Sequence, residues 1–305
     1  MYFCSRNNIK FLCNMATINS IVFKTRFRVD SLTVYNRAGL MVVRSRHNSS
    51  KGGACTVAQM RMRSWFTNQM NLWHCFPQAF RPVFEERRAG VSPINLFIAH
   101  GKCCDPVFLA RHEAQNGACV LTPVVVADGT LPPIALSHDG VAPVTDLAVG
   151  ALAVDADTTV AALSAAIVRG NGGFCFGDEL LYYLGLQQWD AVHNMPVVEM
   201  RCSRLVLCRA DNRTVVEATG GGAGFAVRGG RVAAAAEVQG GMAWVHVRRR
   251  PAGLLCSSQR LLCNNPLIAR YSGSEAMEAA GRSYGVVTEA QFLVPDGGAC
   301  GCQSL

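Results

Sequence analysis

Cysteine, histidine and acidic side chains are the residues of this chain that could do chemistry, and the cysteines argue against a metal site. The chain has 14 cysteines but no Cys-x-x-Cys pair. The closest spacings are Cys103-Cys104 and Cys300-x-Cys302, and neither has a His or Cys partner at zinc-finger spacing. The N-terminal stretch does not read as a secretory signal, so a disulfide framework is not expected either. We predict reduced thiols that behave as small hydrophobic residues, with no metal and no cofactor.

The histidines and acids also lack a catalytic pattern. His246 alternates with apolar residues in a strand-like run, which is typical of a residue on one face of a sheet. Asp178 and Glu179 follow a Gly turn, and Asp155 and Asp157 precede a helix, where turn and capping roles explain them. No Gly-x-Ser-x-Gly nucleophile motif occurs. We predict no catalytic residues and a protein that is not an enzyme.

A glycine-rich segment is the remaining candidate for phosphate chemistry. Residues 220–224 (GGGAG) follow TVVEAT, which resembles a strand. A phosphate-binding loop needs Gly-Lys-Ser/Thr next, and this chain continues with FAVRGG instead. The segment is therefore interpreted as a loop between strands.

Arginines are the side chains that point to a partner. Residues 1–111 hold 16 Lys and Arg against 4 Asp and Glu, whereas the remainder holds 13 against 17. A basic front on a mildly acidic body suits nucleic acid or an acidic protein surface. Only 4 of the 29 cations are Lys and none forms a dense run, so an arginine-biased coding background explains the charge equally well. The candidate interaction residues are Arg37, Arg44, Arg46, Arg61 and Arg63.

Those arginines belong to a predicted β-hairpin and the helix after it. Residues 18–29 and 32–46 are rich in β-type residues, and Asn36-Arg37-Ala38-Gly39 supplies a turn. Alternation places Val42, Arg44 and Arg46 on one face, so we expect an interaction edge, with a merely solvated edge as the alternative. A two-stranded hairpin alone is marginal in water, so it must dock on other elements or on another subunit.

From residue 56 the period changes to that of a helix. Thr56 and Gln59 fit a capping box, and apolar residues at three- and four-residue steps continue to Phe76, before Pro77. A shorter helix is predicted in PQAFRPVFEERRAG, and a third from Ser92-Pro93 to Gly101.

The remainder is predicted to be mainly β. The runs FCFGDELLYYLGLQQW and MPVVEMRCSRLVLC indicate strands, and MAWVHVRRR and LLCSSQRLLC indicate a second hairpin around residues 250–253. One helix, TTVAALSAAIVRG, is capped by Asp157 or Thr158, and residues 274–281 form a short helix.

These elements predict an α+β protein: an N-terminal hairpin and short helices, then a mainly antiparallel sheet or sandwich with one inserted helix. The expected segments are a non-structural extension (1–14), the hairpin (15–53), a helical unit (54–101), the β-rich body (102–283) and a C-terminal tail (284–305).

Several short motifs resemble an uncharacterised Bacteroidetes family of unknown function. They are Tyr35-x-Arg37-x-Gly39, Val43-Arg44, Thr56-x-x-Gln59 with Arg63, Ser92-x-x-Asn95-x-Phe97, Ala127-Asp128-Gly129-x-Leu131-Pro132, Thr158-Thr159-Val160, Gly177-Asp178-Glu179-Leu180 and Ser257-x-Gln259-Arg260-Leu261. The resemblance covers roughly residues 16–285 and depends on the order of many weak motifs. It implies a soluble bacterial protein associated with prophages or mobile elements, and it brings no catalytic residues. Cys55 departs from the family pattern, which weakens any thiol function.

Three functional hypotheses remain. The first is a non-catalytic structural, assembly or protein-interaction protein that self-associates or binds a protein partner. The second is a nucleic-acid-associated protein that uses the basic N-terminal part, and the third is an enzyme with a dispersed site. The chain has no apolar run of the length that crosses a membrane, so we expect no membrane contact and a cytoplasmic location, in a bacterium or encoded by a phage or mobile element.

Overall fold

The computed structural model describes residues 15–18, 27–29, 32–37, 40–45, 57–85, 91–104, 106–221, 224–251 and 253–285. The predicted extension (1–14), Arg46 and most of the predicted tail lie outside these residues. The described residues fall into two units, which divide the chain into Met1–Ala54 with Arg87–Ser92, and Cys55–Glu86 with Pro93–Leu305.

The first unit contains a four-stranded antiparallel sheet in the order β1-β4-β3-β2. Arg37 pairs with Leu40 across a two-residue connection, so the predicted hairpin is confirmed. Val34 and Val42 are buried, whereas Arg44 is exposed. The strands are β1 (Met15–Ile18), β2 (Phe27–Val29), β3 (Leu32–Arg37) and β4 (Leu40–Ser45).

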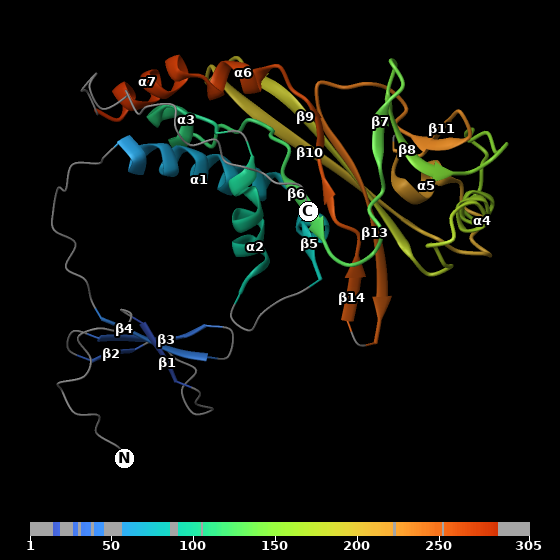
Figure 1. The fold of residues 1–305 in the computed structure, drawn as a ribbon, viewed down its shortest axis with the longest axis horizontal. Coiled ribbons are helices and arrows are strands. Elements are labelled where there is room, and N and C mark those ends of the chain that lie inside the picture. Colours follow the sequence, from blue (N-terminus) through green and yellow to red (C-terminus); the bar gives the residue numbers. More distant parts are fainter. Residues whose placement is uncertain are drawn as a thin grey trace. The chain divides into compact units, whose positions relative to one another are not determined.

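A five-stranded sheet forms the centre of the second unit (Figure 1), in the order β10-β9-β13-β14, with β16 paired to β13. β9 and β10 pair antiparallel along their whole length without a break in register. The central strands confirm the predicted mainly antiparallel sheet and second hairpin. They are β9 (Glu179–Asp190), β10 (Met195–Val206), β13 (Gly240–Arg250), β14 (Gly253–Cys256) and β16 (Leu262–Asn264).

Each face of this sheet is covered by a separate hydrophobic core, because side chains alternate along β9 and β13. Leu181 and Tyr183 of β9 and Val245 of β13 belong to one core, and their neighbours Tyr182 and Trp244 belong to the other. Strands buried on both faces have near-continuous apolar sequences, as ELLYYLGL and GGMAWVHV show. Helices α1 and α2 cover the first face, and α4 and α5 cover the second (Figure 1).

The helices agree with most of the predicted ones. The amphipathic helix expected up to Phe76 is α1, and the Ser-Pro start at residue 92 opens α2. Thr159 caps α4 by accepting a hydrogen bond from the Ala162 amide, so the predicted caps at Asp157 and Thr158 are wrong by one or two residues. The helices are α1 (Val57–Cys75), α2 (Pro93–His100), α3 (Arg111–Gln115), α4 (Val160–Gly170), α5 (Val215–Thr219), α6 (Leu267–Ser272) and α7 (Ser274–Ser283), with 3-10 turns η1 (Gln78–Phe80) and η2 (Gly101–Cys103).

Two smaller sheets complete the second unit, in the orders β11-β12-β8-β7 and β15-β6-β5. Their strands are β5 (Val83–Phe84), β6 (Val125–Asp128), β7 (Leu136–His138), β8 (Pro143–Ala148), β11 (Ala226–Arg228), β12 (Arg231–Ala233) and β15 (Gln259–Arg260).

Two local predictions are wrong. The helix expected in PQAFRPVFEERRAG is a 3-10 turn followed by β5, because Val83 and Phe84 pair in parallel with β6. The strand expected in TVVEAT is α5. The Thr214 hydroxyl and the Glu217 carboxylate form a reciprocal capping box that outweighs the β preference of two valines.

The fold class is α+β, as predicted. The predicted helical unit (54–101) and β-rich body (102–283) share one core, since Leu72, Trp73 and Phe97 from the helices contact the same cluster as Tyr183 and Val245 of the sheet. No helix among the described residues is long and apolar enough to cross a membrane.

Candidate functional site

The predicted interaction arginines do not form one described cluster. Arg37 ends β3, Arg44 is exposed on β4, and Arg61 and Arg63 occupy exposed positions of α1. Arg46 lies outside the described residues. The first two arginines and the second two belong to different units.

The hairpin strands do not lie at an edge of the described sheet, and the contact of their arginines with a partner stays a prediction. β1 pairs with the outer side of β4, and β2 pairs with the outer side of β3. The hairpin strands are therefore the two inner strands of the sheet. A two-stranded hairpin is marginal alone, and the flanking segments supply the strands that stabilise it.

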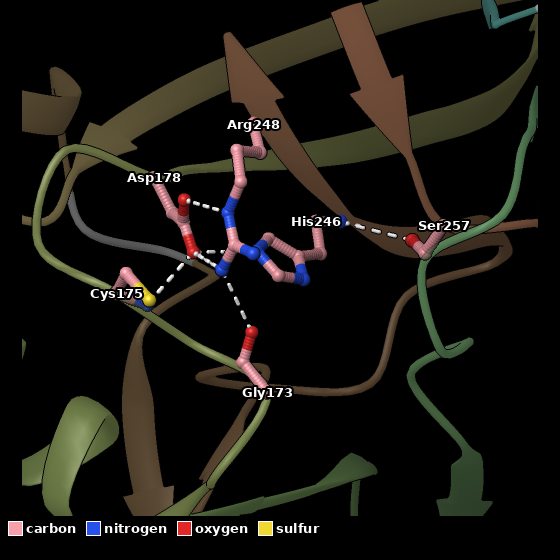
Figure 2. Close-up of polar contacts among 6 residues, drawn as sticks. All are labelled: Gly173, Cys175, Asp178, His246, Arg248 and Ser257. Carbon is pink, nitrogen blue, oxygen red and sulfur yellow. Dashed lines mark hydrogen bonds and ion pairs between the residues drawn. The ribbon is translucent and has the colours of Figure 1, made fainter. Parts of the chain in front are cut away.

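A charged cluster that the sequence analysis missed lies inside the second unit, where β9 begins beside β13. Figure 2 shows the carboxylate of Asp178 facing Arg248 and His246. Arg248 donates from Nε to Oδ1 and from Nη2 to Oδ2 of Asp178, both at 2.7 Å. His246 Nε2 lies 2.8 Å from the same Oδ2, which also accepts the Cys175 amide at 2.8 Å. Arg248 Nη2 reaches the carbonyl of Gly173 at 2.9 Å.

The protonation states of this cluster follow from burial and hydrogen bonding. Burial alone would raise the pKa of Asp178, but hydrogen bonds from Arg248, the Cys175 amide and His246 outweigh it and lower the pKa. Burial lowers the pKa of His246 more than the carboxylate raises it. At neutral pH, Asp178 is therefore ionised, Arg248 is its cation, and His246 is neutral and donates from Nε2.

The cluster acts as a structural clamp. The side chains of His246 and Asp178 are 1% and 3% exposed, and the ring of Phe174 stacks on the His246 ring with centroids 4.0 Å apart. Ser257 Oγ accepts the backbone amide of His246 rather than facing its ring. These groups fasten the residues before β9 to β13 and leave the imidazole out of a solute's reach.

The sequence contained a partial signal for the clamp. His246 and Arg248 are two residues apart on a strand, so they share a face, and the prediction that His246 lies within a strand is confirmed. Asp178, however, was assigned to turn chemistry. Its partners are about 70 residues away in sequence, a separation at which local patterns carry no pairing information.

A second polar group of residues lines an open cleft of about 190 Å³. Asp128 accepts a hydrogen bond from Ser258 Oγ at 2.8 Å, and its other oxygen lies 3.4 Å from His100 Nε2. The carboxylate thus separates the serine from the histidine, whereas nucleophilic catalysis needs the histidine in contact with the serine. The cleft is lined by Phe84, Glu85, Leu96, His100, Asp128, Gly129 and Thr130.

This cleft brings together two motifs of the family resemblance, because Leu131 and Ser257 form a parallel bridge. Hydrogen bonds from Thr130 and Cys256 hold Glu85 in the cleft lining. Burial would raise the pKa of Glu85, but hydrogen bonds from Thr130 and from the Cys256 amide outweigh it and lower the pKa. Within the described part of the chain, no three His, Cys, Asp or Glu side chains are arranged to hold a metal ion.

The outer edge of β10 is the candidate interaction site. β10 is 12 residues long and lies at one end of the central sheet. The amide of Leu207 donates to Asp178 and its carbonyl accepts from Gly177, so the odd-numbered residues of β10 turn their backbone groups toward β9. The even-numbered residues turn theirs away from it. Pro196, one of these, accepts the Cys119 amide at 2.9 Å.

From Val198 onward, no described strand pairs with this edge. On one face of the edge Val198, Met200 and Cys202 contact the first core. On the other face Glu199 and Arg201 are exposed and form an ion pair of 2.8 Å. An edge of this kind offers backbone hydrogen bonds, an apolar row and a charged row to another strand.

Comparison with known proteins assigns no family. No protein-family model, no curated protein and no solved structure matches the chain. The resemblance to the Bacteroidetes family therefore stays a prediction.

Proposed function

We propose that this protein is a non-catalytic interaction protein that binds a protein partner through the open edge of β10. The observation that carries the proposal is the length of that edge, with even-numbered residues directing their backbone groups outward from Val198 to Val206. A partner strand added there would gain main-chain hydrogen bonds, and the alternating side chains would supply specificity.

The two polar clusters support this proposal over an enzymatic one. The clamp at Asp178 places its histidine out of contact with solutes. In the open cleft, Asp128 lies between His100 and Ser258, so the serine lacks the adjacent histidine of a nucleophilic triad. Both arrangements hold loops against strands. Among the described residues, the edge of β10 then offers the longer row of backbone groups without a paired strand.

A proline at Cys202 tests the proposal. The amide of Cys202 points away from β9, so Cys202→Pro removes a donor from the open edge while the pairing with β9 remains. Cys202→Ala is the matched control, because it removes the same thiol and keeps the amide.

The assay is affinity purification with quantitative mass spectrometry, together with light scattering and titration of duplex DNA. We expect a protein partner that is retained by Cys202→Ala and depleted by Cys202→Pro, with equal melting temperatures for the two variants. Equal partner capture by both variants, in a wild-type protein that is monomeric, would refute the proposal. DNA binding that survives both changes would favour the nucleic-acid alternative.

A further inference from the structure

Resting on the proposed function, we infer that the partner strand on the open edge of β10 is β10 of a second copy of this chain, paired antiparallel about a two-fold axis at Met200. In such a pair both strands must present outward-facing backbone groups, so even-numbered residues pair with even-numbered residues. The sum of the two residue numbers is then even and constant along the interface.

Charge selects one register among those allowed. With Met200 opposite its own copy, Glu199 of each strand lies directly opposite Arg201 of the other. Moving the axis to residue 199 or 201 would instead place Glu199 or Arg201 opposite itself, and like charges directly opposite are destabilising. The register at Met200 is therefore the one in which Glu199 and Arg201 face each other across the two-fold axis of an isologous interface.

The geometry of that register favours the charged pair. Odd-numbered residues form the non-hydrogen-bonded pairs, whose side chains are the closer ones. Glu199 and Arg201 are exposed and already share one ion pair within the strand, so each carboxylate would gain a second guanidinium.

The apolar face of the edge fits the same register. Val198, Met200 and Cys202 are packed against the first core, and the register places Val198 opposite the Cys202 position of the other strand. The row would then continue from one copy into the next. Pro196 limits the paired length, because its carbonyl already accepts the Cys119 amide. Five residues, 198–202, remain for each strand, so we expect weak, concentration-dependent dimers.

Charge reversal tests both the partner and the register, with sedimentation velocity over a range of concentrations as the measurement. Wild-type protein should dimerise. Glu199→Arg and Arg201→Glu should each raise the dimer dissociation constant by about tenfold or more, since two attractive pairs become repulsive. An equimolar mixture of the two variants should recover a heterodimer, because each introduced charge then faces its opposite. Arg213→Glu, which breaks the ion pair of Arg213 with Asp211 outside the paired segment of β10, should leave association unchanged.

Two outcomes overturn the inference. One is wild-type protein that stays monomeric at its highest soluble concentration, and the other is a mixture that fails to recover the dimer that each single variant lost. Neither outcome refutes the proposed function, which fails only if the Cys202 variants also leave capture of other proteins unchanged. Melting temperatures equal to wild type show that the variants are folded.

Discussion

Replacing Asp178 by asparagine should disrupt the hydrogen bonds of the clamp at the start of β9 and lower the free energy of unfolding. The carboxylate accepts four hydrogen bonds and donates none: two come from Arg248, one from His246 and one from the Cys175 amide. An asparagine has one acceptor oxygen, and its amide group would face one of these donors. Arg248 would then remain a partly buried cation without its counter-ion.

The magnitude follows from burial. Removing one partner of a buried ion pair costs about 3–5 kcal/mol. The Arg248 side chain is 20% exposed, so water can recover part of its solvation, and we expect the lower end, about 3 kcal/mol. For a unit of this size that loss corresponds to a decrease of about 6–12 °C in melting temperature.

Glu179→Gln is the matched control. Glu179 is the next residue and also pairs with an arginine, at 2.8 Å, but the side chain of its partner Arg249 is 62% exposed. A pair whose cation stays hydrated contributes about 0–1 kcal/mol. Urea unfolding followed by circular dichroism measures both variants. If Asp178→Asn costs no more than Glu179→Gln, the assignment of the cluster as a clamp is wrong.

Three further predictions concern pH, a close backbone approach and the shared core. The folded state lowers the pKa of His246 below 6.5, so the contribution of the neutral imidazole to the free energy of unfolding is complete above pH 6.5 and is lost as the pH falls. His246→Gln keeps an N–H donor but does not titrate. The variant should therefore lose less stability than the wild type in urea titrations between pH 7 and 5. Gly129→Ala should destabilise by about 1–3 kcal/mol, because its Cβ would overlap the backbone carbonyl oxygen of Cys256. Gly172→Ala, with open space around it, should change the melting temperature little. Trp73→Ala should cost about 3–5 kcal/mol in chemical unfolding, and the helix and sheet signals should disappear in one transition. The exposed Phe66→Ala should cost far less. Separate transitions for helices and sheet would contradict a shared core.

The sequence by itself determined the elements whose signals are local. The two-residue hairpin connection, the period of α1 and the apolar runs of β9 and β13 each depend on residues close together in the chain, so the fold class followed from them. Local patterns failed where a distant partner or a cap decided the outcome. Val83 and Phe84 became a strand only because β6 lies beside them.

Tertiary structure alone decided which groups meet and which edges stay open. The arginine-bearing hairpin became the inside of a sheet when β1 and β2 paired with it. Asp178 found its partners about 70 residues away, and β10 became an edge through the strand order of the central sheet. Alternation in the sequence assigns a residue to one face of its own strand. Which residue lies opposite depends on contacts between segments that are far apart in the chain, and the candidate site of this protein is formed by such contacts.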